Sequence, residues 1–133
     1  MRLLIVDDSL VVWRRLFDML KDLSDVSFLA YSRNLSEARH YLAGFGPDLL
    51  VLDISLPDGS GLDLLQDVRL RGLGTKVAIF SNLSELRGVS LDLGADWYFD
   101  KSMDYPQLLS LIEDRAYWAK QHIGRDGVNH AEF

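Results

Sequence analysis

Short runs of apolar residues alternate along the chain with longer segments in which apolar positions recur at helical spacing. The runs cover Leu3–Val6, Val26–Tyr31, Leu49–Leu52, Val77–Phe80 and Trp97–Phe99. Runs that are apolar at nearly every position are typical of strands buried on both faces. The intervening segments predict helices at about residues 9–23, 35–44, 61–71, 84–93 and 105–121. This alternation predicts an α/β fold with a doubly wound five-stranded parallel sheet, strand order 2-1-3-4-5, and five helices.

Small polar residues at the predicted helix starts agree with these boundaries. Ser9 is placed to cap the first helix, Asn34 or Ser36 the second, and Ser84 the fourth. Pro106 suits the first turn of the last helix, where a missing N–H costs nothing. Residues 57–61, with the sequence PDGSG, are predicted to form a loop before the third helix.

The polar residues that interrupt the apolar pattern follow the predicted strands. They are Asp7 and Asp8 after the first strand, Asp53 after the third, Ser81 and Asn82 after the fourth, and Asp100 and Lys101 after the fifth. The carboxyl ends of parallel strands meet at one edge of a doubly wound sheet, and ligands bind there where the strand order reverses. In the predicted order that point lies between strands 1 and 3, so Asp7, Asp8 and Asp53 are expected to meet.

Three neighbouring carboxylates repel one another, so such a site must either raise a pKa or bind a cation. Oxygen ligands without His or Cys suit Mg²⁺, with Mn²⁺ as a second choice. Lys101 adds a positive charge, Ser81 a hydroxyl and Asn82 a backbone N–H for phosphate oxygens. A carboxylate nucleophile with these groups is what phosphoryl transfer requires. A single Asp after a strand is more often a helix cap, but capping does not explain the whole set.

Three stretches together resemble the response regulator receiver (CheY-like) domain of two-component signalling systems. They are Leu4–Asp8 (LIVDD), Leu49–Gly61 (LLVLDISLPDGSG) and Gly94–Lys101 (GADWYFDK). The resemblance extends over about residues 2–121 and implies the flavodoxin-like version of the doubly wound fold. We assign residues 1–122 to this domain, with 123–133 as a polar tail or the start of a linker.

The resemblance implies a role for each residue of the set. Asp53 would be the phosphoacceptor, receiving its phosphoryl group from the phosphohistidine of a sensor histidine kinase or a histidine phosphotransfer protein. Asp8, Asp53 and the backbone carbonyl of Ser55 would bind Mg²⁺ directly, and Asp7 through a water molecule. Ser81 and Tyr98 would form the switch, biasing the surface made by the fourth helix, fifth strand and fifth helix. That surface is also a candidate for homodimer formation.

Two residues depart from the family pattern. Ser102 follows Lys101 where the family commonly has Pro, so the loop after the fifth strand is expected to differ in shape or to be more mobile. Asn82 stands where a small residue is usual, and its bulk is expected to alter access to the phosphoryl group.

A second apolar row on the first helix, Leu10, Trp13 and Phe17, has two interpretations. It either packs against the last helix or Trp118, or it is a docking surface for the helical phosphodonor, and exposed rings would favour docking. Most of the aromatic residues near the fifth strand are expected to pack in the core; the alternative is a dimer or target surface, for which Trp97 is the first residue to examine.

Bulk composition narrows the function further. The chain has no cysteine, which excludes disulfides, thiolate metal sites and Cys nucleophiles. A net charge of −6 argues against direct nucleic-acid binding by this domain. No apolar run approaches the ~18 residues of a membrane span and no secretory signal is recognisable, so a cytoplasmic protein is expected.

Three rival functions remain. A pseudo-receiver, an interaction module that does not depend on phosphorylation, would keep the fold but show no response to Mg²⁺ and beryllofluoride. An aspartyl-nucleophile phosphohydrolase needs a second Asp at position 55, which is Ser. A flavin protein of this fold needs a Ser/Thr-rich phosphate loop after the first strand, which this chain lacks. The receiver is therefore expected to assist its own phosphorylation without being a turnover enzyme.

Overall fold

Five parallel strands form the central sheet of the computed structural model, which describes residues 1–114. They are β1 (Arg2–Val6), β2 (Phe28–Ser32), β3 (Leu49–Leu52), β6 (Lys76–Ser81) and β7 (Trp97–Asp100). Their order is β2-β1-β3-β6-β7, and every pairing is parallel. Because β6 and β7 are the fourth and fifth strands of this sheet, the predicted order 2-1-3-4-5 is confirmed.

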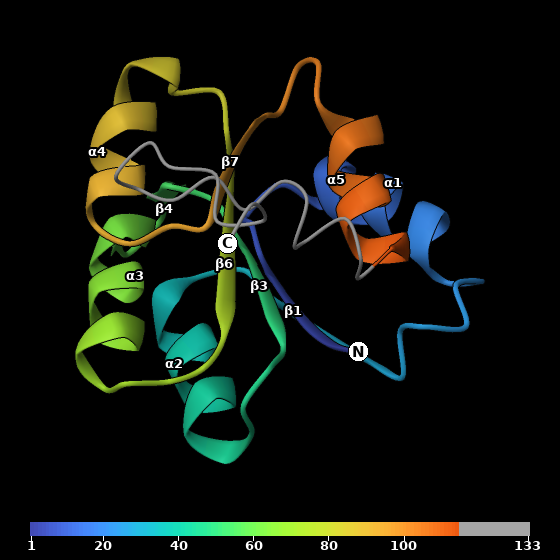
Figure 1. Cartoon of the computed structure of the whole chain (residues 1–133), viewed down its shortest axis with the longest axis horizontal. Helices are drawn as coiled ribbons and strands as arrows, with labels where there is room; N and C mark the ends of the chain where they lie inside the picture. Colours follow the sequence, from blue (N-terminus) through green and yellow to red (C-terminus); the bar gives the residue numbers. More distant parts are fainter. Residues whose placement is uncertain (115–133) are drawn as a thin grey trace, which may run out of the picture.

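Helices cover both faces of the sheet. They are α1 (Leu10–Leu20), α2 (Leu35–Gly44), α3 (Gly61–Leu70), α4 (Arg87–Asp92) and α5 (Tyr105–Glu113), with a 3₁₀ turn, η1 (Ser84–Leu86), before α4. In Figure 1, α1 and α5 lie on one side of the sheet and α2, α3 and α4 on the other. In the described residues α5 ends at Glu113 with Asp114 as its C-cap, and residues 115–121 of the predicted last helix lie outside that range.

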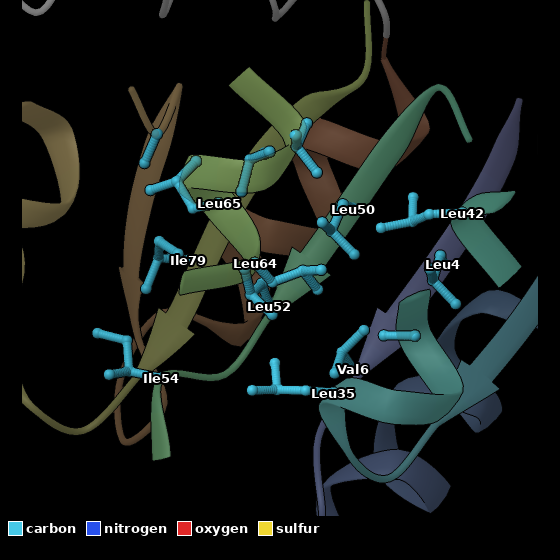
Figure 2. Close-up of a cluster of buried hydrophobic side chains, with 14 of the residues drawn as sticks. Leu4, Val6, Leu35, Leu42, Leu50, Leu52, Ile54, Leu64, Leu65 and Ile79 are labelled. Carbon is cyan, nitrogen blue, oxygen red and sulfur yellow. The ribbon is translucent and has the colours of Figure 1, made fainter. Parts of the chain in front are cut away.

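The sheet separates two hydrophobic cores, and alternate residues of each strand contribute to one or the other. Leu4 and Val6 of β1 pack in the core beneath α2 and α3 (Figure 2). Leu3 and Ile5 pack on the opposite face beneath α1 and α5. All four are fully buried, so both faces of the strand are apolar, as the uninterrupted apolar run predicts.

Helix caps match the sequence patterns in two of three cases. The Ser9 hydroxyl accepts the Val12 N–H at α1, and the Asn34 side chain accepts the Glu37 N–H at α2, so Asn34 rather than Ser36 is the cap. The cap predicted at Ser84 is wrong, because Ser84 is the first residue of η1 and makes no side-chain cap bond there.

The loop predicted at residues 57–61 is replaced by a small hairpin. It consists of β4 (Ser55–Leu56) and β5 (Gly59–Ser60), and Gly59 has a φ of 144°, a conformation that favours glycine. Asp58 at the hairpin tip accepts the Leu35 N–H at 2.8 Å and the Ser36 N–H at 3.0 Å. These bonds lower the pKa of Asp58 and join the hairpin to the start of α2. The segment directly after Asp53 is thereby fixed in place.

Candidate metal and phosphoacceptor site

Strand pairing brings the three predicted aspartates together at the carboxyl edge of the sheet. Asp7 and Asp8 follow β1, and Asp53 follows its neighbour β3. The Asp53 N–H donates to the Val6 carbonyl at 2.9 Å, which extends the β1–β3 pairing to the residue next to Asp7. One carboxylate oxygen from each aspartate lies within 4.8 Å of the others. The site therefore forms at the reversal of strand order where it was expected.

The three carboxylates differ in their exposure to solvent. Asp7 and Asp53 retain only 2% and 6% of their accessible surface, whereas Asp8 is exposed. Burial raises the pKa of Asp53, and only part of that effect is offset by its hydrogen bond with Lys101. Asp53 is thus a desolvated carboxyl group at the floor of the site, with Asp8 at its open side.

Lys101 provides the positive charge of the site. Its Nζ lies 2.6 Å from Asp7 Oδ2 and 2.9 Å from Asp53 Oδ2. Burial alone would lower the pKa of Lys101, but the bonds to the two carboxylates outweigh it and the pKa is raised. The ammonium therefore stays charged at neutral pH. Because one ammonium does not balance three carboxylates, the donor set fits a divalent cation that prefers oxygen ligands.

Asp7 and Asp8 differ in whether their carboxylate oxygens already have hydrogen-bond partners. Asp7 Oδ1 accepts the Ser9 N–H at 2.8 Å while Oδ2 faces Lys101, so both oxygens of Asp7 are engaged. Asp8 has no side-chain hydrogen bond to any residue in the described range 1–114, and its exposed carboxylate is available to a cation.

Ser81 and Asn82 lie at the end of β6, on the other side of Asp53 from β1. Ser81 is buried, and its hydroxyl accepts the Leu83 N–H at 3.0 Å. Asn82 is exposed. Ser55 is also exposed and begins β4 two residues after Asp53. The structure thus places the polar residues predicted after the strands at the carboxyl edge of the sheet. The role of each residue stays a prediction.

A family model described as the response regulator receiver domain matches residues 3–113. The chain belongs to this family. It is accordingly a receiver domain of the response regulators of two-component signalling, and the resemblance seen in the three sequence stretches is confirmed.

Curated relatives include proteins much longer than the matched part. The chain is 31% identical over 141 residues to the swarming motility regulation protein RssB of Serratia marcescens, covering 98% of this chain and 64% of that protein. It is 31% identical over 115 residues to the transcriptional regulatory protein CiaR of Streptococcus pneumoniae, covering 84% and 50%. A protein-glutamate methylesterase/protein-glutamine glutaminase of a Nocardioides species is 31% identical over 104 residues, covering 75% and 28%. The chain thus spans less than two thirds of the length of these relatives.

Solved structures support the flavodoxin-like receiver fold. The response regulator domain of Thermotoga maritima CheB has a TM-score of 0.76 at 24% identity, covering 89% of this chain and 96% of that one. The BeF₃-activated receiver domain of Klebsiella pneumoniae RstA has a TM-score of 0.76 at 24% identity, covering 89% and 98%. At these identities the likeness concerns the fold alone.

The receiver's predicted switch tyrosine lies in an inward position. Tyr98 is buried, and its hydroxyl donates to the Ser81 carbonyl at 3.3 Å, a long and therefore weak bond. Burial raises the pKa of Tyr98, so the phenol stays protonated and can donate at neutral pH. The ring packs in the core beneath α3 and α4. The Tyr98 hydroxyl and the Ser81 carbonyl are thus in contact, and their action as a switch stays a prediction.

Local hydrogen bonds close the loop between β7 and α5, where Ser102 replaces the common Pro. Ser102 donates its N–H to Asp100 Oδ1 at 2.7 Å, and its hydroxyl donates to the same oxygen. Both bonds lower the pKa of Asp100. Asp104 in turn accepts the Asp100 N–H at 2.8 Å. The turn that carries Lys101 is therefore held by side-chain bonds, and the expected difference in loop shape or mobility stays a prediction.

Tyr31 supports the site, although the sequence patterns did not single it out. Its hydroxyl donates to the Asp7 carbonyl at 2.7 Å, and its ring stacks on Trp13 with a centroid separation of 4.3 Å and an interplanar angle of 1°. Burial, followed by the nearby Asp7, raises the pKa of Tyr31. The missing signal was the alignment of β2 beside β1, which pairs Tyr31 with Ile5.

The apolar row on α1 is partly exposed. Leu10 and Phe17 each retain 42% of their accessible surface, and Trp13 is half-buried, with its ring stacked on Tyr31 of β2 at the edge of the core beneath α1 and α5. The alternative contact with Trp118 lies outside the described residues. Leu10 and Phe17 therefore have the exposure that docking requires, whereas the Trp13 ring does not, and the docking role stays a prediction.

The suggestion that Trp97 belongs to a dimer or target surface is wrong. Trp97 retains only 6% of its accessible surface and packs in the core beneath α1 and α5. It lies on β7, whose alternate residues face opposite sides of the sheet, so its ring enters a core rather than solvent.

Within residues 1–114, no helix is both long and apolar enough to span a bilayer.

Proposed function

We propose that this receiver domain accepts a phosphoryl group on Asp53 and relays that event through its α4–β7–α5 surface. The donor is the phosphohistidine of a sensor histidine kinase or a histidine phosphotransfer protein. The observation that carries the proposal is the meeting of a buried Asp53 with Asp7, Asp8 and Lys101 in one site. A buried carboxylate flanked by further acids and a lysine is costly for folding, so function is its best explanation.

Asp8, Asp53 and the Ser55 carbonyl would hold Mg²⁺, or Mn²⁺ in its place. Asp7, with both oxygens already engaged by Ser9 and Lys101, would act through a water molecule. When bound, the cation supplies positive charge against the carboxylates and the incoming phosphoryl oxygens.

In the transfer step an Asp53 oxygen attacks phosphorus while the P–N bond to the donor imidazole breaks. The electron pair of that bond returns to the imidazole nitrogen, and Asp53 becomes an acyl phosphate. Lys101, now 2.9 Å from Asp53, would pair with the phosphoryl group, and the Asn82 N–H would donate to one of its oxygens. The Ser81 hydroxyl would exchange its place beside the Leu83 N–H for a bond to the phosphoryl group.

A movement of Ser81 would change the α4–β7–α5 surface through Tyr98. Tyr98 bonds the Ser81 carbonyl and has the Arg87 guanidinium of α4 6.0 Å from its ring centroid. A shift of Ser81 toward Asp53 therefore changes the contacts between β7 and α4. The α4–β7–α5 surface is then biased between two arrangements, which a homodimer or target would distinguish.

Partner choice follows from surface chemistry. The row Leu10, Trp13 and Phe17 begins two residues after Asp8 and suits a helical phosphodonor that must bring its histidine to Asp53. The net charge of −6 makes direct DNA contact by this domain unfavourable, so any such contact would belong to another domain.

In this proposal the receiver assists its own phosphorylation and dephosphorylation and is not a turnover enzyme. A cytoplasmic site of action follows from this role.

Beryllofluoride with Mg²⁺ tests the proposal, because it mimics the phosphoryl group on a carboxylate. We expect amide NMR shifts around Asp53, Ser81 and Tyr98, and their loss in Asp53→Asn. Asp63→Asn, which changes the same charge at an exposed position of α3, is the control and should respond like the wild type. No response in the wild type would make the chain a pseudo-receiver, an interaction module independent of phosphorylation.

A further inference from the structure

The Tyr31 side chain connects the edge of the sheet to the acidic site. Tyr31 lies on β2, an edge strand, and its hydroxyl reaches across β1's carboxyl end to the Asp7 carbonyl at 2.7 Å. We propose that Tyr31 is a positioning residue, which holds the peptide between Asp7 and Asp8 in the orientation needed for cation binding. The proposal rests on the proposed function, since it concerns the same site.

The ring of Tyr31 is itself held in place from α1. Trp13 stacks on it at 4.3 Å with the two planes only 1° apart. Trp13 belongs to the first turn of α1, where its N–H donates to the Ser9 carbonyl at 3.0 Å. Ser9 follows directly after Asp8, so the same short segment is gripped from β2 through Tyr31 and from α1 through Trp13. A flat stack of this kind restricts rotation of the Tyr31 ring and keeps its hydroxyl aimed at Asp7.

The Asp7 carbonyl is a further anchor of this residue, whose N–H donates to the Ser32 carbonyl at 3.0 Å. The two carboxylate oxygens of Asp7 are engaged by the Ser9 N–H and Lys101 Nζ. With the carbonyl held by Tyr31, the plane of the Asp7–Asp8 peptide is fixed, because a peptide unit is rigid. Asp8 follows this peptide and has no side-chain bond of its own within residues 1–114. Its direction therefore depends on how firmly the peptide before it is held.

Electrostatics make such a support useful. Before a cation binds, the carboxylate of Asp8 is repelled by Asp7 and Asp53, whose oxygens lie within 4.8 Å. An unsupported turn would let Asp8 move away from the other two. Each cation bound would then have to bring it back, which weakens binding. The Tyr31 hydroxyl thus affects affinity for the cation, whereas the attack by Asp53 does not involve it.

The test compares Tyr31→Phe with Tyr41→Phe, which removes the same hydroxyl from a tyrosine on α2. Mg²⁺ affinity is measured by calorimetric titration, and the phosphorylation rate with a phosphoramidate at saturating Mg²⁺. From the loss of one hydrogen bond we expect Tyr31→Phe to bind Mg²⁺ about three- to tenfold more weakly. Its rate at saturation should stay within about twofold of the wild type, since the reacting groups are unchanged. Tyr41→Phe should match the wild type in both.

Two further measurements separate positioning from stability. The amide nitrogen of Asp8 belongs to the peptide that Tyr31 holds, so its NMR shift should change in Tyr31→Phe and not in Tyr41→Phe. Trp13→Leu keeps the hydroxyl but removes the stack, and it should weaken Mg²⁺ binding in the same direction by a smaller factor.

Three outcomes would overturn the proposal. Equal Mg²⁺ affinity in Tyr31→Phe and wild type would show that the hydroxyl positions nothing. Lower folding stability without the split between affinity and saturated rate would give it a purely structural role. A wild type that binds no Mg²⁺ at all would instead remove the proposed function, and the positioning role with it.

Discussion

Two buried aspartates, Asp53 and Asp96, lie at different ends of the sheet. They retain 6% and 8% of their accessible surface, and each faces a cation at hydrogen-bonding distance. Asp53 is 2.9 Å from Lys101 Nζ at the end of β3, and Asp96 is 2.6 Å from the Arg69 guanidinium at the start of β7. Burial and pairing therefore do not distinguish them.

The ratio of acids to donors does distinguish them. Asp96 accepts both the Arg69 guanidinium and the Val77 N–H, at 2.6 and 2.8 Å, and Lys76 lies 3.9 Å away. Asp53 shares one ammonium with Asp7 and has Asp8 beside it. Asp96 is thus a compensated charge that fastens α3 to β7. Asp53 has fewer donors than the acids around it need, and burial raises its pKa, as the proposed binding of a cation and a phosphoryl group would require.

The largest expected effect comes from Asp53→Asn. The amide cannot form an acyl phosphate, so incorporation of a phosphoryl group from a cognate donor should fall to background. Because the fold disfavours the charged form of Asp53, the free energy of unfolding should stay the same or rise. Labelling is followed by phosphate-affinity electrophoresis and stability by urea denaturation. Full labelling of this variant would refute the assignment.

Asp96→Asn should show the opposite pattern. Removing one partner of a buried ion pair leaves the other uncompensated, so we expect a loss of about 3 kcal/mol in unfolding free energy. Phosphorylation of the folded fraction should persist. Asp92→Asn, an exposed residue of α4, is the matched control and should change stability by less than about 0.5 kcal/mol. If Asp96→Asn is as stable as the control, the contrast between the two aspartates is wrong.

Mg²⁺ should raise the unfolding free energy of the domain by binding beside Asp53 and not beside Asp96. At a hundredfold excess over its dissociation constant, a single bound cation adds about 2.7 kcal/mol to the unfolding free energy. We expect this gain in the wild type and in Asp96→Asn, and its loss in Asp8→Asn. Thermal melts with and without Mg²⁺ measure it. An equal gain in Asp8→Asn would mean that the cation binds elsewhere.

The smallest effect is the pH dependence due to Asp53. Its pKa in the folded protein lies above the ordinary 3.8, so in the interval between the two values the folded state holds a proton that the unfolded state has released. Stability of the wild type relative to Asp53→Asn should therefore fall as pH rises through that interval and become constant above it. Urea denaturation of both chains across acidic pH tests the sign. A relative gain with rising pH would contradict the raised pKa of Asp53.

Much of the fold was predictable because each strand carries its own signal. Strands buried on both faces appear as apolar runs, and their alternation with helices restricts the topology to a doubly wound sheet. The meeting of Asp7, Asp8 and Asp53 followed from that topology, since the three residues come at the carboxyl ends of neighbouring strands. Their roles in phosphoryl transfer came from the family resemblance.

The features that were missed depend on contacts between distant segments. Tyr31 and Asp7 are joined across 24 positions, and Asp58 reaches Leu35 across 23. The hairpin of residues 55–60 has strands of only two residues, too short for any periodicity. Trp97 carried no local signal for which core it enters, because a buried aromatic and a surface aromatic look alike in sequence.

The location of the phosphoryl group tests the central claim most directly. The protein is incubated with a phosphoramidate donor and Mg²⁺, the acyl phosphate is reduced with borohydride to homoserine, and the peptides are sequenced by mass spectrometry. We expect homoserine at Asp53, absent without donor and strongly reduced when Mg²⁺ is chelated. Modification at Asp7, Asp8 or Asp96 in place of Asp53, or an equal yield without Mg²⁺, would contradict the account.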